Sequence, residues 1–139
     1  MRIGITGASG LIGTALTRHL RAGGHEVVAI VRRQAAGDTE LSWDPPAGTI
    51  DRDGLTRLDA VVHLAGAGIG DKRWTDAYKR TLLESRTVTT DLLARTMADL
   101  GSEGPSVLVS GSAIGFYGDR GDDELDEGSP RGTGFLSDI

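Results

Sequence analysis

Two kinds of hydrophobic pattern alternate along this chain. Short, nearly continuous apolar runs such as Glu26–Val31 are typical of parallel strands that are buried on both faces of a sheet. Longer segments, in which apolar residues recur at helical spacing, lie between them. This alternation predicts an α/β, doubly wound parallel sheet. We expect strands over residues 2–6, 26–31, 40–43, 59–65 and 106–110, main helices over 11–21 and 75–100, and a brief helix within 51–58.

The strand over 40–43 depends on a short connection. Parallel neighbours usually need a crossover of about a dozen residues, and the polar link 34–39 is too short to hold a helix. A proline-containing turn over 44–48 follows this strand. The third strand is therefore expected to join the second one directly, without a helix between them.

A glycine-rich turn follows the first strand without a spacer. Gly7, Gly10 and Gly13 stand between that strand and a helix whose apolar residues share one face. Glycines let a turn be tight and let a pyrophosphate approach the amides at the positive end of a helix. With 21 glycines in 139 residues the spacing alone is weak, and a turn with no ligand is the alternative. The strand before it and the helix after it favour nucleotide binding. We expect Leu11, Ile12, Ala15, Leu16 and Leu20 to form the apolar face of the helix.

Arg32 and Arg33 end the second strand, where an NAD-binding fold usually carries an acidic residue that accepts from the ribose 2′-hydroxyl. Arginine instead accommodates the 2′-phosphate of NADP. We therefore expect NADP(H) as the cofactor, with NAD(H) the weaker candidate. The same arginines disfavour an adenosyl-methionine site, and solvated surface arginines are the remaining alternative.

The ends of the later strands carry the other candidates for chemistry. His63 lies inside an apolar run and is expected to be a satisfied core histidine. Small residues over 66–70 would let a flat cofactor lie close to the backbone. Ser112 and Tyr117 follow the last predicted strand, so their hydroxyls are the leading candidates for contact with a small-molecule substrate.

Composition and charge exclude several classes of function. The net charge is −5, and no basic run exceeds Arg32–Arg33, so nucleic acid is not an expected partner. There is no cysteine, and the three histidines lack metal-ligand spacing, so neither a disulfide nor a metal site is expected. The acidic segment 119–127 is expected to be an exposed loop. No apolar run approaches the ~18 residues of a membrane span, and we expect a cytoplasmic protein. The oligomeric state is not predicted.

Several motifs resemble those of a known superfamily. GASGLIG, DAVVHLAGAGI, KRW, the SR of LLESRTVTT and VSGSAIGFYGD resemble extended short-chain dehydrogenases/reductases. More narrowly, they are similar to the atypical branch described as nucleoside-diphosphate-sugar epimerase-like or cell-division-inhibitor-like. The resemblance covers essentially the whole chain and implies a Rossmann-like fold, for which we expect the strand order 3-2-1-4-5.

The resemblance also implies roles for individual residues. Ser112 would bind the substrate oxygen, Arg86 replaces the asparagine usual on the long helix, and Tyr117 is a candidate replacement proton donor. The cofactor would contact Gly7, Ser9, Gly10, Leu11, Ile12 and Gly13 with its pyrophosphate, Arg32 and Arg33 with its 2′-phosphate, Trp43 and Asp44 with its adenine, and Leu64, Ala65 and Gly66 with the ribose on the nicotinamide side.

One departure from the superfamily pattern leaves two functions open. The Tyr-x-x-x-Lys pair should fall near Phe135 or Leu136, where there is no tyrosine, and Ile139 occupies a position near that of the lysine. An NADP-dependent oxidoreductase or epimerase that acts on a small carbonyl or sugar-nucleotide substrate is one hypothesis. A non-catalytic NADP-binding sensor or partner-binding protein is the other. Because extended members are about twice as long, we expect residues 1–139 to be the cofactor-binding domain, with the substrate-binding part absent.

Overall fold

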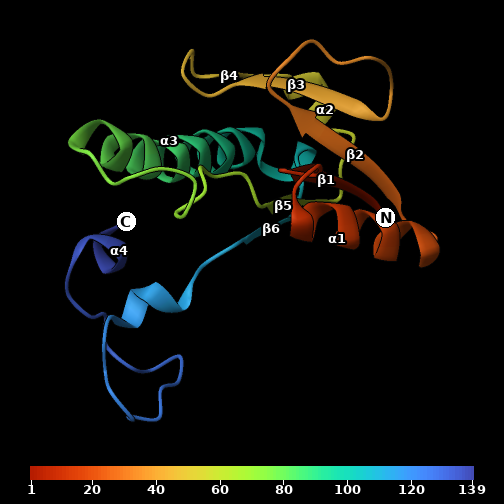
Figure 1. The fold of residues 1–139 in the computed structure, drawn as a ribbon. Coiled ribbons are helices and arrows are strands. Elements are labelled where there is room, and N and C mark those ends of the chain that lie inside the picture. The colour runs from red at the N-terminus through yellow and green to blue at the C-terminus, as the bar shows by residue number, and fades with distance from the viewer.

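A computed structural model describes all residues of the chain, 1–139, and shows a single six-stranded sheet with helices on both faces (Figure 1). The strands lie in the order β4-β3-β2-β1-β5-β6. The strands are β1 (Arg2–Thr6), β2 (Glu26–Val31), β3 (Glu40–Asp44), β4 (Thr49–Ile50), β5 (Ala60–His63) and β6 (Val107–Ser110). The helices are α1 (Leu11–Ala22), α2 (Arg52–Leu55), α3 (Asp76–Leu100) and α4 (Phe135–Asp138), with 3₁₀ turns η1 (Gly101–Glu103) and η2 (Ile114–Tyr117).

The five predicted strands occupy the predicted order, and all five are parallel. The register pairs Thr6 of β1 with Ile30 of β2 and with His63 of β5, and His63 with Ser110 of β6. The segments that follow these strands therefore leave the sheet at a common edge, where ligands of open α/β sheets bind. The strand order reverses between β1 and β5, so this edge contains a topological switch point.

The short link between β2 and β3 is confirmed as a direct connection. Residues 34–39 contain no helix, and Gly37 adopts φ +146°, a left-handed value that favours glycine. The turn after β3 leads into β4, a two-residue antiparallel strand that the sequence pattern did not predict. A strand this short carries too few side chains for an alternation to be visible.

The larger part of the core lies between α3 and the sheet. Val28, Leu41, Trp43, Val61 and Leu93 belong to one buried cluster on this face. On the opposite face, α1 covers a smaller cluster of Ile3, Ile5 and Val27, against which Leu16 and Leu20 pack. Thr75 caps α3 by accepting a hydrogen bond from the Tyr78 amide, which explains why the long helix begins where it was predicted.

Two apolar segments are less buried than their hydrophobic pattern suggests. Leu11 and Ile12, predicted to share the apolar face of α1, are 92% and 66% exposed. They occupy the first turn of the helix, at the end of the sheet that faces the predicted ligand site. β6 was predicted as a buried strand, but Val107 and Val109 are largely exposed because no helix covers this part of the α1 face.

The chain after β6 leaves the sheet and forms a separate extension that ends in α4 (Figure 1). Its acidic segment 119–127 is mainly exposed, as predicted. Contacts between η2 and α4 dominate its internal packing. None of the helices has the length and apolar character needed to cross a membrane.

Candidate nucleotide-binding site

The glycine turn between β1 and α1 is packed so closely that side chains could not be added at two of its positions. Gly7 has φ +67°, and a Cβ on it would lie 2.9 Å from the carbonyl carbon and oxygen of Leu64. A Cβ on Gly13 would overlap the Gly7 carbonyl oxygen and lie 2.8 Å from the Ala8 Cα. Gly10 is different, because a Cβ added to it would meet only the Gly7 carbonyl oxygen, at 3.3 Å. Gly7 and Gly13 thus shape the turn, whereas Gly10 leaves space on its outer side.

The first turn of α1 presents backbone amides that nothing else in the chain satisfies. Gly10 is the N-cap residue and offers no side-chain cap, and no acidic residue lies in the first turn. The initial N–H groups of an α-helix have no intrahelical partner and carry the positive end of the helix dipole. This arrangement suits an anionic group. The exposed Leu11 and Ile12 flank it.

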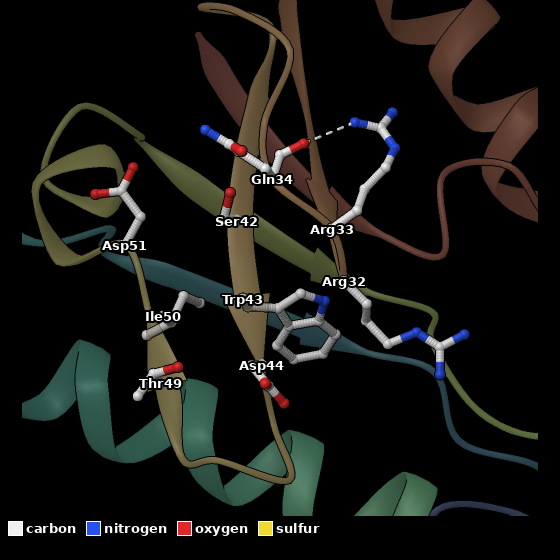
Figure 2. A pocket seen from close by; sticks show the side chains of 9 residues that line it. All are labelled: Arg32, Arg33, Gln34, Ser42, Trp43, Asp44, Thr49, Ile50 and Asp51. Carbon is white, nitrogen blue, oxygen red and sulfur yellow. Dashed lines mark hydrogen bonds between the residues drawn. The ribbon is translucent and has the colours of Figure 1, made fainter.

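A hollow of about 340 Å³ lies next to the ends of β2 and β3. Figure 2 shows that Arg32 and Arg33 point away from each other, Arg32 alongside Trp43 and Asp44, and Arg33 toward Gln34. Arg32 is exposed and makes no hydrogen bond or ion pair, so its guanidinium is free to meet a ligand. The residues that line the hollow are Arg32, Arg33, Gln34, Ser42, Trp43, Asp44, Thr49, Ile50 and Asp51.

Arg33 is held by Glu40 at the start of β3. The two side chains form a bidentate pair with both N···O distances at 2.6 Å, and Arg33 also donates to the Gln34 carbonyl. Glu40 accepts a further hydrogen bond from the Ala36 amide. The Arg33 guanidinium and the Ala36 amide lower the pKa of Glu40 to about 2. The pair therefore fixes the 34–39 link and leaves Arg33 less available than Arg32.

Trp43 is mostly a core residue, with 4% of its surface exposed. Its ring packs edge-on against His63, with the centroids 6.0 Å apart. Asp44 is exposed next to it and accepts from the Ala47 amide in the following turn. Trp43 thus supplies a rigid wall to the hollow, while Asp44 offers a free carboxylate oxygen at its rim.

The segment after β5 is fixed by side chains from two other elements. The Thr6 hydroxyl accepts from the amides of Leu64 and Ala65, and the Ser85 hydroxyl on α3 accepts from the Ala67 amide. Arg86 donates to the Ala67 carbonyl at 3.2 Å and to the Leu82 carbonyl at 3.0 Å. Thr6 and Ser85 were not among the predicted site residues. Sequence reasoning could not find them, since each acts through backbone groups far away in the chain.

The three predicted catalytic residues have different surroundings in this structure. No hydrogen bond joins Ser112, Tyr117 and Arg86 to one another; Ser112 is exposed, and the Tyr117 hydroxyl donates to the Asp126 carbonyl at 2.9 Å. Arg86 lies against Gly66, with its guanidinium carbon 3.6 Å from where a Gly66 Cβ would be. Arg86 and the predicted ribose-binding segment are thus neighbours, whereas Tyr117 belongs to the extension after β6.

A second hollow lies between the start of α3 and the extension. Trp74, from the KRW motif, packs edge-on against Phe135 with a centroid distance of 5.6 Å, and its indole N–H donates to the Ile69 carbonyl. Lys79 lies over the Phe135 ring. These contacts are among the few that connect the extension to the rest of the chain. Trp74 and Phe135 line the hollow with Ile114, Gly115, Gly118, Asp119, Thr133, Gly134, Leu136 and Ser137.

A family profile matches most of the chain. Residues 3–133 match the NAD dependent epimerase/dehydratase family. The chain is 44% identical to an epimerase family protein of Mycobacterium bovis over 137 residues. The match covers 99% of this chain and 44% of that protein. The chain thus spans less than half the length of the curated relatives that it matches.

Solved structures of related proteins have a similar fold. The human epimerase family protein SDR39U1, solved with NADPH, aligns with a TM-score of 0.82 at 32% identity, over 99% of this chain and 45% of that one. A nucleoside-diphosphate sugar epimerase from Corynebacterium glutamicum aligns with a TM-score of 0.81 at 39% identity, over 99% of this chain and 28% of that one.

Proposed function

We propose that this chain, which belongs to the NAD dependent epimerase/dehydratase family, binds NADP(H). The site lies at the edge of the sheet formed by the ends of β1, β2, β3 and β5. The observation that carries the proposal is the unpaired, exposed Arg32 beside the hollow next to Trp43. A guanidinium in that place suits the 2′-phosphate, which NAD lacks. The NADPH found in the human relative supports the same cofactor.

The residues present fit a dinucleotide. The pyrophosphate would meet the uncapped amides of α1 on the open side of Gly10, where a Cβ would otherwise protrude. Arg32 would hold the 2′-phosphate, and Trp43 and Asp44 would flank the adenine. The segment Leu64–Gly66, fixed by Thr6, would lie along the ribose on the nicotinamide side. When bound, the nicotinamide ring supplies or accepts a hydride.

Calorimetric titration of NADPH and NADH tests the cofactor. We expect NADPH to bind more tightly and Arg32→Ala to weaken it about 10- to 100-fold, the loss of one charge-assisted contact, with NADH unchanged. Arg33→Ala is the matched control and should weaken NADPH much less, because Glu40 already holds that guanidinium. Equal effects of Arg32→Ala on both cofactors, or no binding of either, would refute the proposal.

We propose further that the chain serves an oxidoreductase or epimerase that acts on a small carbonyl or sugar-nucleotide substrate. Ser112 would contact the substrate oxygen, and Lys72, Arg73 and Trp74 would lie near it. Activity assays over carbonyl and nucleotide-sugar panels, with Ser112→Ala as the test variant, would check this role. We expect Ser112→Ala to lower turnover at least tenfold while leaving NADPH affinity intact.

A non-catalytic, NADP-binding protein is the second candidate, and one observation favours it. The Tyr117 hydroxyl, the only candidate proton donor, is engaged with the Asp126 carbonyl, and the Arg86 guanidinium is held by two backbone carbonyls. Cofactor binding without turnover on every substrate panel would support this candidate, and turnover abolished by Ser112→Ala would refute it.

A further inference from the structure

A chain of buried polar side chains crosses the centre of the molecule from β1 to α3. Thr6, His63 and Thr89 are 0%, 4% and 8% exposed. The Thr6 hydroxyl oxygen lies 2.7 Å from His63 Nδ1, and His63 Nε2 lies 3.1 Å from the Thr89 hydroxyl oxygen. The imidazole thus bridges the sheet and the long helix directly behind the segment 64–66.

The hydrogen bonds of Thr6 determine which nitrogen of the His63 imidazole carries the proton. The Thr6 hydroxyl oxygen already accepts from the amides of Leu64 at 3.0 Å and Ala65 at 3.1 Å. A hydroxyl offers two lone pairs and one proton, so Thr6 can only donate to His63. Nδ1 must then be an acceptor, and the ring proton resides on Nε2.

The hydrogen bonds of Thr89 on α3 agree with this assignment. Thr89 donates its own proton to the Ser85 carbonyl at 2.7 Å, with the Arg86 carbonyl 3.1 Å away. Its oxygen is therefore free to accept from His63 Nε2–H. One neutral tautomer of His63 satisfies every partner, and the reverse tautomer would place two donors face to face at Thr6.

We propose that His63, held as the neutral Nε2–H tautomer, is a positioning residue that fixes the Leu64 and Ala65 amides through Thr6, and that protonation of His63 loosens the nucleotide site. The proposal rests on the proposed NADP(H) binding. A protonated imidazole donates from both nitrogens. Thr6 would then have to turn its proton away from His63, and its hydroxyl oxygen could accept from only one of the two amides; the Leu64 amide would keep its 3.3 Å contact with the Thr6 carbonyl, whereas the Ala65 amide has no second acceptor.

No side chain in contact with the imidazole stabilises its protonated form. The side chains that hydrogen-bond to the imidazole or pack on its ring are Thr6 from β1, Thr89 from α3 and Trp43 from β3, and none of them is charged. Arg86, one turn from Thr89, directs its guanidinium to the Leu82 and Ala67 carbonyls. Burial lowers the pKa of His63 below its usual 6.5. The neutral state is therefore the resting state near neutral pH.

Two-bond ¹H–¹⁵N correlation spectra of the imidazoles test the tautomer directly in the wild-type protein. His63→Asn identifies the His63 signals among the three histidines by their disappearance. We expect the His63 ring to show the Nε2–H pattern at pH 7.5. An Nδ1–H ring, or a charged one at this pH, would overturn the proposal.

Titration of oxidised NADP, which is stable in acid, between pH 8 and pH 5 tests the coupling. In the wild type, affinity should fall up to about tenfold per pH unit below the His63 pKa, since binding then requires deprotonation. The carboxamide that His63→Asn introduces offers Thr6 an uncharged acceptor, so this fall should flatten. Oxidised NAD separates the effect from titration of the 2′-phosphate, whose pKa is about 6.

Each result is decisive. A pH dependence that is the same in the wild type and in His63→Asn, with either cofactor, would overturn the role of His63 while leaving NADP binding in place. No binding of either cofactor at any pH would overturn the proposed function and the coupling together, and the tautomer spectra would then stand as a separate result. If His63→Asn does not fold, Thr6→Ser should retain wild-type affinity, whereas Thr6→Val should weaken it about tenfold.

Discussion

The first 100 residues and the segment from β6 to the end of the chain support their candidate residues in different ways. In the first region, the loop after each strand is held by another element: Gly7 against Leu64, Arg33 by Glu40, and the Ala67 backbone by α3. In the second region, most contacts are internal, such as those of Tyr117 with Asp126 and of Ser137 with the Gly115 carbonyl. A nucleotide site can therefore be built within this chain, whereas the catalytic candidates Ser112 and Tyr117 of the second region have no comparable support.

The comparison can be tested with pairs of identical substitutions, one in each region. The largest effect is expected for glycine. Gly13→Ala would force a Cβ into the Gly7 carbonyl and the Ala8 backbone, and such overpacking costs about 3 kcal/mol of unfolding free energy. Gly128→Ala meets only a carboxylate oxygen at 3.4 Å and has no left-handed φ, so its cost should be below about 0.5 kcal/mol. Urea unfolding measures both. Equal costs would show that the glycine turn is not the more constrained region.

Valine on adjacent strands gives the next pair. Val61 on β5 is fully buried in the α3-side cluster, whereas Val109 on β6 is 54% exposed. Val61→Ala should cost about 2 kcal/mol or more, because two buried carbons are lost and a cavity remains. Val109→Ala should change stability by less than about 0.5 kcal/mol. A large effect at Val109 would mean that the outer face of β6 is covered in solution.

The hydrophobic pattern predicted the fold because the main elements of this fold are set by local periodicity and by strand burial. The five main strands, both long helices and the glycine turn follow from it, and Thr75 and Gly101 limit α3 as capping rules require. The exposure of Leu11 and of β6 could not be predicted in this way. Helical spacing identifies which residues share a face, but not where the sheet beneath that face ends, and an apolar run does not reveal which element covers it.

The nucleotide site was predicted only in outline for a related reason. The glycines and Arg32 lie next to strand ends, where sequence position alone places them. The difference between Arg32 and Arg33 depends on the register that brings Glu40 within 2.6 Å of one of them. Thr6 and Ser85 hold backbone amides more than ten residues away. Such contacts leave no local pattern in the sequence.

The two tyrosines of the chain offer a smaller contrast between the regions. Each hydroxyl donates to a backbone carbonyl: Tyr78 to Gly68 at 2.6 Å and Tyr117 to Asp126 at 2.9 Å. Tyr78 is 9% exposed, so Tyr78→Phe should cost about 1 kcal/mol or slightly more. Tyr117→Phe, at a more exposed bond, should cost less than about 0.5 kcal/mol. Chemical denaturation of both variants measures the difference, and a larger loss for Tyr117→Phe would reverse the comparison.

The smallest effect concerns two glutamates and appears only in acid. The pKa of Glu40 is about 2 in the folded protein, mainly because of Arg33, against an ordinary value of 4.5. A group with a lowered pKa stabilises the fold above its unfolded pKa and loses that contribution as the pH falls toward the folded value. Between pH 4.5 and 2, Glu40 should therefore contribute up to about one proton to the uptake on unfolding.

Glu40→Gln should remove this proton uptake, whereas Glu124→Gln should leave the acid unfolding curve unchanged, because Glu124 makes no ion pair in the exposed acidic loop. Unfolding free energies measured at several pH values between about 5 and 2 give the proton uptake from their slopes. Curves that coincide for the wild type and Glu40→Gln would mean that Arg33 is not held by Glu40 in solution. Arg33 would then be available to the 2′-phosphate beside Arg32, and Arg33→Ala should weaken NADPH binding as strongly as Arg32→Ala.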